Sequence, residues 1–251
     1  MRDLSDGLTA LREVMELGEI MRLIERTARW VDPATFRLLP VWYPEHSRGS
    51  HFYKADWSEP QYNTNRQTGI KEHKREGNLH GNKALTNALG FVSDDRPNWS
   101  CCHIWGVDDS KFQSANAIVQ DGRFFSCVAN MVLLPTPLKA FTDAMPEVKA
   151  MLRICSRHLY GWHCDHDGAI EAVSLIDSWD EWQAYPASWP RKSGPTQIPG
   201  IVPLNDTIRR FAQRRIARIQ RDIAQAGPFY PRDKVRSALS YWSIDPDDWN
   251  I

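Results

Sequence analysis

The spacing of apolar residues predicts two amphipathic helices in the first two thirds of the chain. From residue 7 to residue 30, apolar side chains recur among charged ones, and no proline occurs before Pro33. Residues 146–160 carry apolar side chains three and four positions apart, and Gly161 follows as a helix stop. Because a helix places such positions on one face, each segment is expected to pack that face against the core.

A third helix is predicted from Asn205 or Asp206, either of which would cap it, to about Ala226, where Gly227 and Pro228 end it. Its apolar stripe consists of Ile208, Ala212, Ile216, Ile219 and Ile223. The rest of its surface carries Arg209, Arg210, Arg214, Arg215, Arg218 and Arg221. Such a helix packs its stripe on the core and presents its charges to water or to a partner.

Shorter elements are predicted between these helices. A short helix is expected at residues 83–89, with Gly90 as its stop, and two strands at residues 99–105 and 123–129, separated by a polar loop. A further helix should begin near Pro135. The order of strand, loop, strand and helix predicts an α+β protein that is mainly helical around a small core.

The same pattern divides the chain into three regions. Residues 1–90 form an N-terminal region of helix and basic loop. Residues 91–165 contain the predicted strands and the helices that follow them. Residues 166–251 form a C-terminal region that holds the arginine-rich helix.

Composition narrows the class of protein without choosing a function. Hydrophobic residues make up 42% of the 251 residues, and 31 basic residues balance 31 acidic ones, as in ordinary folded proteins. A polyanion must therefore be met by local basic patches, since attraction to phosphate is screened beyond about 8 Å at physiological salt. Residues 1–6 include acids where a secretory signal needs an apolar run, and no stretch has the length of a membrane span. We expect a cytoplasmic protein with no membrane partner.

Two segments supply candidate patches for binding nucleic acid. Residues 58–83 are polar and basic, and the candidates there are Lys74 and Arg75. The arginine-rich helix offers three more candidates away from its apolar stripe: Arg210, Arg214 and Arg221. Arginine suits phosphate because its planar guanidinium donates two hydrogen bonds at once. The alternative is that both segments simply face water.

A histidine and an asparagine carry the main functional prediction. His103 is followed by Ile104 at the end of the first predicted strand, and Asn130 lies 27 positions after His103. Asn130 is followed by an aliphatic run, a turn and the helix near Pro135. This arrangement resembles the HNH (ββα-metal) endonuclease family, whose first strand ends in His and Ile and whose later segment reads Asn, aliphatic residues, turn and helix.

The resemblance implies a metal-dependent endonuclease that hydrolyses phosphodiester bonds, with DNA favoured over RNA. His103 would be the base that activates water, since a neutral imidazole suits that role. Asn130 would position this imidazole or ligate the divalent ion, Mg²⁺ or Mn²⁺. The helix would supply Lys139, which could hold a phosphate, and Asp143, an oxygen ligand suited to Mg²⁺.

The sequence departs from the family pattern at two positions. Many members have Asp before the base histidine, where this chain has Cys102, and the place of the last family histidine is taken by Lys139. A protonated lysine cannot ligate a metal. A packing role for His103, a turn role for Asn130 and a cap role for Asp143 therefore stay open as alternatives.

A second group of metal-ligand residue types follows Gly161. It consists of His163, Cys164, Asp165 and His166, to which Cys155, Cys101 and Cys102 could contribute. Zinc takes such side chains as tetrahedral ligands. The chain has no Cys-x-x-Cys pair, so reduced cysteines are favoured over structural Zn²⁺, and five cysteines without a secretory signal argue against disulfides.

Three functions compete at this stage. The first is an endonuclease. The resemblance to the HNH family suggests a role in restriction, phage defence or a mobile element. The second is a nucleic-acid-binding protein with a degenerate HNH-like core, a hypothesis that Cys102 and Lys139 favour. The third is a structural subunit that meets a protein partner or a second copy of itself. A cleavage assay with and without Mg²⁺ or Mn²⁺ separates the first from the other two.

Overall fold

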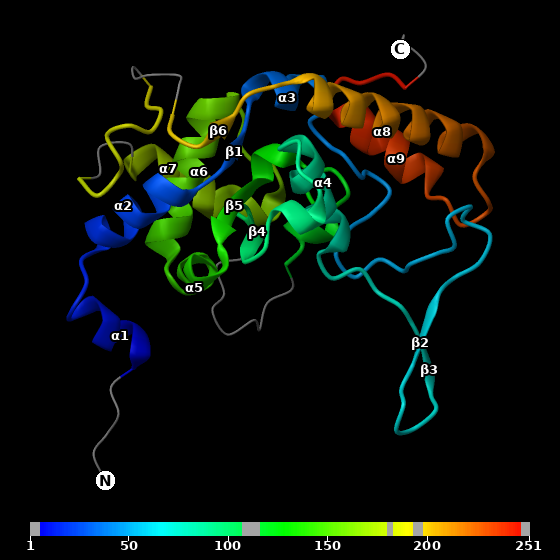
Figure 1. Ribbon diagram of the computed structural model, residues 1–251, viewed down its shortest axis with the longest axis horizontal. Coiled ribbons are helices and arrows are strands. Elements are labelled where there is room, and N and C mark those ends of the chain that lie inside the picture. Colours follow the sequence, from blue (N-terminus) through cyan, green and yellow to red (C-terminus); the bar gives the residue numbers. More distant parts are fainter. Residues whose placement is uncertain (1–5, 107–115, 180–182, 193–197, 247–251) are drawn as a thin grey trace.

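The structure is a computed structural model that describes residues 6–106, 116–179, 183–192 and 198–246. In this part of the chain, helices surround small strand pairs, which confirms the α+β class (Figure 1). The helices are α1 (Gly7–Arg12), α2 (Leu17–Thr27), α3 (Pro33–Leu38), α4 (Leu79–Ala88), α5 (Lys139–Ala144), α6 (Pro146–Tyr160), α7 (Ile170–Trp179), α8 (Asp206–Gln225) and α9 (Arg232–Tyr241). The strands are β1 (Trp30–Val31), β2 (Tyr62–Thr64), β3 (Lys71–His73), β4 (Trp99–His103), β5 (Met131–Pro135) and β6 (Ile201–Val202).

The antiparallel pair β4 and β5 lies at the centre of the fold, with His103 opposite Met131. Successive residues of a strand point to opposite faces. One face packs against α2 and α6 through Cys102, Val132 and Leu134. The other face packs against α4 and α8 through Cys101, Met131 and Leu133. Both faces are buried, which explains why β5 is a continuous apolar run rather than an alternating one.

The two hydrophobic clusters draw on all three regions of the sequence. The first cluster joins Ile20 of α2 to Ile198 near the C-terminal helices. The second joins Val31 of β1 to Ile216 of α8. The three regions therefore share their cores, and the central strand pair depends on helices from both ends of the chain.

Helix periodicity in the sequence predicts α6 and α8 well. Gly161 ends α6 with φ +64°, the left-handed conformation that a residue with a side chain rarely adopts. Asn205 caps α8, because its side-chain oxygen accepts a hydrogen bond from the backbone nitrogen of Ile208 at 3.0 Å. All five residues of the predicted apolar stripe of α8 are buried. The short helix expected at residues 83–89 is longer in the structure, where it is α4 and is followed by Gly90 at φ +73°.

The single helix expected at residues 7–30 is two helices in the structure. Between α1 and α2, Glu16 begins a new helix with Glu19. The backbone nitrogen of Glu16 donates to a carboxylate oxygen of Glu19 at 2.9 Å, one half of a capping box. This hydrogen bond marks the start of α2, so the prediction of one continuous helix is wrong.

The strand expected at residues 123–129 is also wrong. These residues form turns that lead into a 3₁₀ turn at Val128–Asn130, and the strand begins at Met131 instead. The backbone oxygen of Phe124 accepts a hydrogen bond from the side chain of Asn130, and that of Phe125 accepts one from His103. Because side chains occupy these carbonyl groups, the segment follows a turn rather than a strand ladder.

The C-terminal helices pack on the loop after α3. Val41 and Trp57 of that loop form a third cluster with residues of α8, α9 and their connection: Ile219, Ile223, Tyr230, Val235 and Leu239. The β2–β3 hairpin projects away from the rest of the molecule, and all residues of both strands are exposed (Figure 1). Among the described helices, none combines the length and apolar composition that crossing a membrane requires.

Candidate functional site

His103 ends β4 with its ring against α4. Its Nε2 lies 2.8 Å from the backbone oxygen of Phe125, to which it must donate because a carbonyl only accepts. The ring lies so close to Gly81 that a Cβ there would be 3.2 Å from its Cε1. Burial lowers the pKa of His103 to about 4, although the hydrogen bond to Phe125 acts in the opposite direction. The imidazole is therefore neutral at pH 7, and its Nε2 is engaged inside the protein.

Asn130 is fully buried at the start of β5, and both ends of its amide are engaged. Its Oδ1 accepts a hydrogen bond from the backbone nitrogen of Trp105 at 2.7 Å. Its Nδ2 donates to the backbone oxygen of Phe124 at 3.1 Å. The structure thus brings Asn130 and His103 to the same turn at residues 124–125, where both side chains bind backbone groups.

Lys139 and Asp143 lie on the other side of the strand pair. They form an exposed ion pair on α5, with Lys139 Nζ 2.5 Å from Asp143 Oδ2. The side chain of Cys102 hydrogen-bonds Thr142 of the same helix, whereas the next residue, His103, lies against α4. Asn130 and Asp143 therefore do not come together, and the residues predicted from the HNH resemblance do not fit one shared metal ion.

The partly buried imidazole of His103 leads to a prediction about acid stability. Its pKa falls from 6.5 in the unfolded chain to about 4 in the folded protein. As the pH falls below 6.5, the unfolded state binds a proton first, so stability is lost between pH 6.5 and pH 4. We expect His103 to contribute on the order of 3 kcal/mol to this loss. The variant His103→Gln keeps a donor for Phe125 but does not titrate.

Urea unfolding of both proteins at several pH values checks this expectation. The parent should lose more free energy of unfolding than His103→Gln over this pH range, whereas equal losses would show that the imidazole is as accessible to protons when folded as when unfolded.

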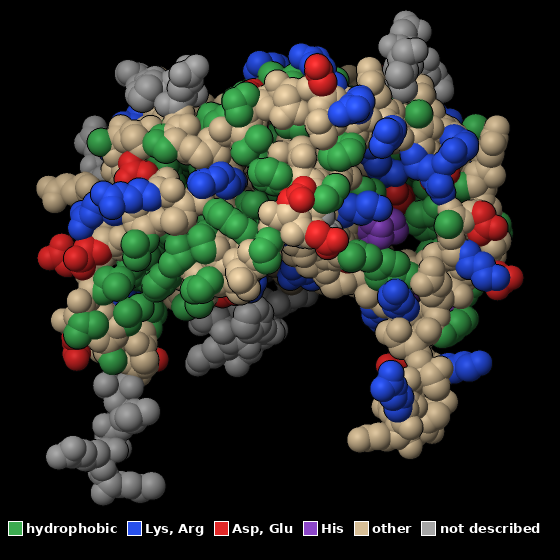
Figure 2. Space-filling model, in the orientation of Figure 1, with side chains coloured by type: hydrophobic (Ala, Val, Ile, Leu, Met, Phe, Trp, Pro, Cys, Tyr) green, Lys and Arg blue, Asp and Glu red, His purple; other side chains and the backbone are tan. Residues whose placement is uncertain are grey.

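The basic residues predicted to bind nucleic acid lie at the molecular surface. Arg210, Arg214 and Arg221 are exposed along α8, and Arg75 is exposed at the base of the β2–β3 hairpin. Lys74 is partly buried, with its Nζ 4.8 Å from the ring centre of Phe52. Figure 2 shows Lys and Arg side chains gathered over α8 and along the hairpin, with a hollow between them in which histidine is visible.

Three metal-ligand side chains that were not among the sequence-based candidates lie close together: His46, Glu76 and His80. His46 and His80 line the cavity between the hairpin base and α8. One ligand atom from each residue lies within 4.8 Å of the other two. Among the described residues, no other set of three or more His, Cys, Asp or Glu side chains has its ligand atoms this close together. His46 comes from the loop after α3, and Glu76 and His80 lie on either side of the start of α4.

Glu76 fixes the orientation of His80. Its Oε2 lies 2.5 Å from His80 Nδ1, and its Oε1 accepts a hydrogen bond from the backbone nitrogen of Leu79 at 2.5 Å. Burial raises the pKa of Glu76, but these hydrogen bonds outweigh burial and the pKa is lowered, so Glu76 is a carboxylate. Nδ1 of His80 donates to this carboxylate, so in the neutral form of the ring the lone pair is on Nε2, as in metal-binding histidines that a carboxylate orients.

His46 presents a buried nitrogen that lacks a partner. Its ring is stacked on that of His80, with centroids 3.5 Å apart and planes 7° from parallel. His46 is 7% exposed, and its Nδ1 has no hydrogen-bond partner among the described residues. Burial and the neighbouring His80 hold the pKa of His46 well below 6.5, so the ring is neutral. An unsatisfied buried polar atom costs about 1–3 kcal/mol, which a bound cation would relieve.

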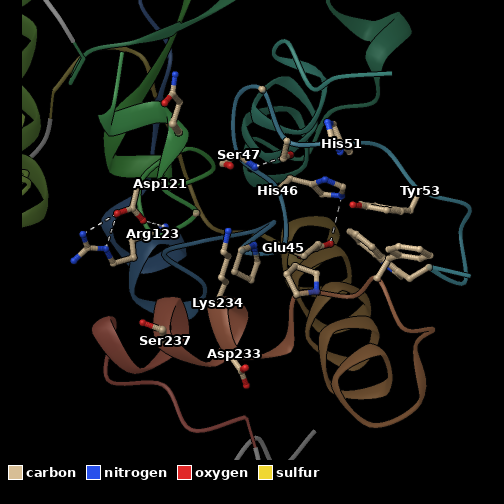
Figure 3. Close-up of a pocket in the computed structure, with 18 of the residues that line it drawn as sticks. Glu45, His46, Ser47, His51, Tyr53, Asp121, Arg123, Asp233, Lys234 and Ser237 are labelled. Carbon is tan, nitrogen blue, oxygen red and sulfur yellow. Dashed lines mark hydrogen bonds and ion pairs between the residues drawn. The ribbon is translucent and has the colours of Figure 1, made fainter. Parts of the chain in front are cut away.

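Two cavities meet at His46. The smaller, of about 440 Å³, lies between the hairpin base and α8. The larger, of about 890 Å³, lies between the loop at residues 44–53, the turn at residues 120–123 and α9 (Figure 3). Glu45, His46, Tyr53 and Trp57 line both cavities. His46 is therefore reached from both cavities, and His80 from the smaller one.

Cations dominate the smaller cavity. Its lining includes Lys54, Lys74, Lys83, Arg215 and Arg218, against the two acids Glu45 and Asp222. Lys83 contacts the ring of Tyr43 at 5.6 Å, and neither it nor Lys74 has a carboxylate partner within the described residues. The surplus of positive charge favours an anionic ligand beside His46 and His80.

A buried ion pair holds the Glu45–His46 segment on α8. Arg215 Nη2 donates to both carboxylate oxygens of Glu45, and Arg215 Nε donates to the backbone oxygen of Trp42. The side chains of Glu45 and Arg215 are 5% and 8% exposed. The guanidinium also lies 4.3 Å from the ring centre of Tyr43. Arg215, which the sequence pattern predicts on the solvated face of the helix, instead positions the loop that carries His46.

The segment after Gly161 makes other contacts. Tyr241 donates to Asp165, and His166 Nδ1 accepts a hydrogen bond from the backbone nitrogen of Gly168. All five cysteines are free and buried. Burial raises the pKa of each thiol above its ordinary value, which favours the protonated form over the thiolate that zinc requires.

Comparison of the chain with protein-family models, with curated proteins and with solved structures finds no match. The functional conclusion therefore depends on the side chains of this protein and on their surroundings. Of the three clustered residues, Glu76 and His80 had a local signal in the sequence, because they are four positions apart at the start of a helix. His46, 30 positions before Glu76, had none.

Proposed function

We propose that this protein is a metal-dependent hydrolase of phosphodiester bonds in nucleic acid, with His46, Glu76 and His80 as its metal ligands. The observation that carries the proposal is the convergence of their ligand atoms within 4.8 Å beside a cavity lined by cations. Catalytic zinc sites commonly use three protein ligands, such as two histidines and one carboxylate, and leave another position for water or substrate. The cluster supplies that ligand set.

A divalent ion bound there would polarise a phosphoryl oxygen and lower the pKa of water in its open position. In the hydrolysis, the water oxygen bonds to phosphorus, one ester bond between phosphorus and oxygen breaks, and the leaving oxygen gains a proton. The residues around the cluster suit the substrate, since Lys74 and Lys83 line the adjoining cavity and can hold phosphate oxygens. Glu76 would keep the tautomer of His80 fixed throughout.

The ligand types favour a transition metal over Mg²⁺. Two imidazoles and one carboxylate suit Zn²⁺ or Mn²⁺, whereas Mg²⁺ prefers oxygen ligands. The proposal thus moves the divalent ion from the vicinity of His103 and Asn130 to His46, Glu76 and His80. Because each nitrogen lone pair lies in the plane of its ring, an ion shared by His46 and His80 would turn the rings out of their parallel stack.

A second candidate is a nucleic-acid-binding protein whose HNH-like core is degenerate. One observation favours it: Nε2 of His103 and both ends of the Asn130 amide are engaged in internal hydrogen bonds. In that case the basic surfaces of α8 and of the hairpin base would bind nucleic acid, and no phosphodiester bond would be cleaved. DNA remains the expected substrate or ligand over RNA, from the resemblance alone.

A metal titration combined with a cleavage assay tests the proposal. After treatment with EDTA and dialysis, the protein should bind one equivalent of Mn²⁺ or Zn²⁺ by isothermal titration calorimetry. Labelled DNA and RNA should then be cleaved with either ion and remain intact with EDTA. Stoichiometric metal binding without cleavage would favour the second candidate. Absence of stoichiometric binding would remove the metal centre itself.

A further inference from the structure

The larger cavity is bordered by a row of aromatic rings that leads to the His46–His80 pair. Phe229 is stacked on Tyr53, with centroids 5.1 Å apart and planes 18° from parallel. Tyr53 is followed by Trp57 at 5.3 Å, and Trp57 by His46 at 5.4 Å, with interplanar angles of 32° and 33°. Four successive ring contacts thus lead from Phe229, in the loop between α8 and α9, to His80.

The end of this row at Phe229 is open to solvent. Phe229 is 44% exposed, an unusual fraction for a large apolar side chain, whereas Trp57 is 6% exposed. Within the described residues, Tyr53 is the aromatic neighbour of Phe229, so the row ends there. An exposed aromatic face at the edge of a cavity is a platform on which a planar ligand such as a nucleobase can stack.

A cation lies across the same cavity. Lys234 extends from α9 toward Glu45 and His46, whereas Asp233 points the other way (Figure 3). In the described part of the chain, no carboxylate forms an ion pair with Lys234. Arg123, on the far wall, is paired with Asp121 at 2.7 Å, which leaves Lys234 as the cation with charge to offer a ligand.

We infer that this cavity binds an unpaired segment of nucleic acid, with a base stacked on Phe229 and a phosphate at Lys234. Its volume of about 890 Å³ exceeds the space that one nucleotide needs. The inference deepens the proposed function and rests on it for the direction of the strand, which would run from this cavity past His46 into the cation-lined one. A duplex keeps its bases paired and stacked on one another, so it cannot offer a base face to Phe229.

Binding measured without metal tests the inference apart from cleavage. In EDTA, fluorescence anisotropy would follow labelled single-stranded DNA, single-stranded RNA and duplex DNA. Phe229→Ala should weaken binding of the single strands about 5- to 150-fold and leave duplex binding unchanged, as expected for loss of one stacked base. Lys234→Gln should reduce the slope of log affinity against log salt by about 0.7, the value for one single-strand phosphate contact.

Matched controls come from α2, whose residues do not line the cavity. Leu23→Ala removes an apolar side chain that is 43% exposed, and Arg22→Gln removes an exposed charge. Phe229→Leu keeps an apolar contact with Tyr53 but has no ring, so a loss shared by Phe229→Ala and Phe229→Leu in folded protein supports stacking. Unchanged single-strand binding in both variants, or equal losses for single strand and duplex, would overturn the inference. Intact Phe229-dependent binding in a protein that cleaves nothing with Mn²⁺ or Zn²⁺ would support it and refute the hydrolase.

Discussion

Replacing His80 with Ala is expected to abolish stoichiometric binding of Mn²⁺ or Zn²⁺ and to reduce cleavage of nucleic acid to background. His80 supplies one of three ligands, and its Nε2 lone pair is directed by the carboxylate of Glu76. Two remaining ligands hold an ion far less well than three. Calorimetry with each metal and a gel assay with labelled DNA and RNA measure the two effects on the same preparation.

A graded variant separates the ligand role from a general loss of structure. Glu76→Gln keeps the size of the side chain and an acceptor oxygen for His80 but removes the negative charge. It should weaken metal binding by at least about 10- to 100-fold, because the neutral amide is a poorer metal ligand than the carboxylate and also orients His80 less well. His163→Ala, which changes an exposed histidine outside the cluster, should leave affinity and cleavage as they are in the parent. If His80→Ala and His163→Ala behaved alike, the cluster would not be the metal centre.

Replacing Arg215 with Met is expected to destabilise the protein by about 3–5 kcal/mol, because it leaves the carboxylate of Glu45 buried without its partner. Arg215 also donates to the backbone oxygen of Trp42, and the substitution leaves this buried acceptor without that hydrogen bond. Methionine fills a similar volume, which keeps the cavity left behind small. The free energy of unfolding in urea gives the size of the effect.

Two further variants identify the cause of that loss. Arg214→Gln changes the adjacent, exposed arginine and should alter stability by no more than about 0.5 kcal/mol. Adding Glu45→Gln to Arg215→Met removes the unpaired charge and should recover part of the loss, which a double-mutant cycle measures. Equal stability of Arg215→Met and Arg214→Gln would mean that the Glu45–Arg215 pair is not buried in solution.

The Glu45–Arg215 pair also connects stability to the candidate site. Glu45 precedes His46, and His46 Nε2 lies 3.8 Å from Glu45 Oε1. Loss of Arg215 would therefore free the loop that carries one proposed metal ligand, so metal affinity should fall in Arg215→Met even at temperatures at which the protein is still folded.

Local pattern determined two long helices of this protein, α6 and α8. In α6 and α8, apolar residues recur at helical spacing and the ends carry Gly161 and Asn205, so chain periodicity and caps fix the bounds without reference to neighbours. The strand β4 also follows from the sequence, but the second strand was expected at residues 123–129, which form turns, and β5 at Met131–Pro135 was not predicted. The turn at residues 124–125 depends on hydrogen bonds from the side chains of His103 and Asn130, which pattern alone does not indicate.

Tertiary structure decided the roles of the polar residues. Arg214 and Arg215 are neighbours of the same chemical type, yet Arg215 lies seven positions after Ile208 and four before Ile219, within the buried stripe. Its burial requires Glu45, 170 positions away, as a partner. Likewise, His46 becomes a candidate metal ligand only because packing of the loop after α3 against α4 brings it to Glu76 and His80. Periodicity reports which face of an element is buried, whereas a site depends on which distant segments that face meets, and this is fixed by packing of the whole chain.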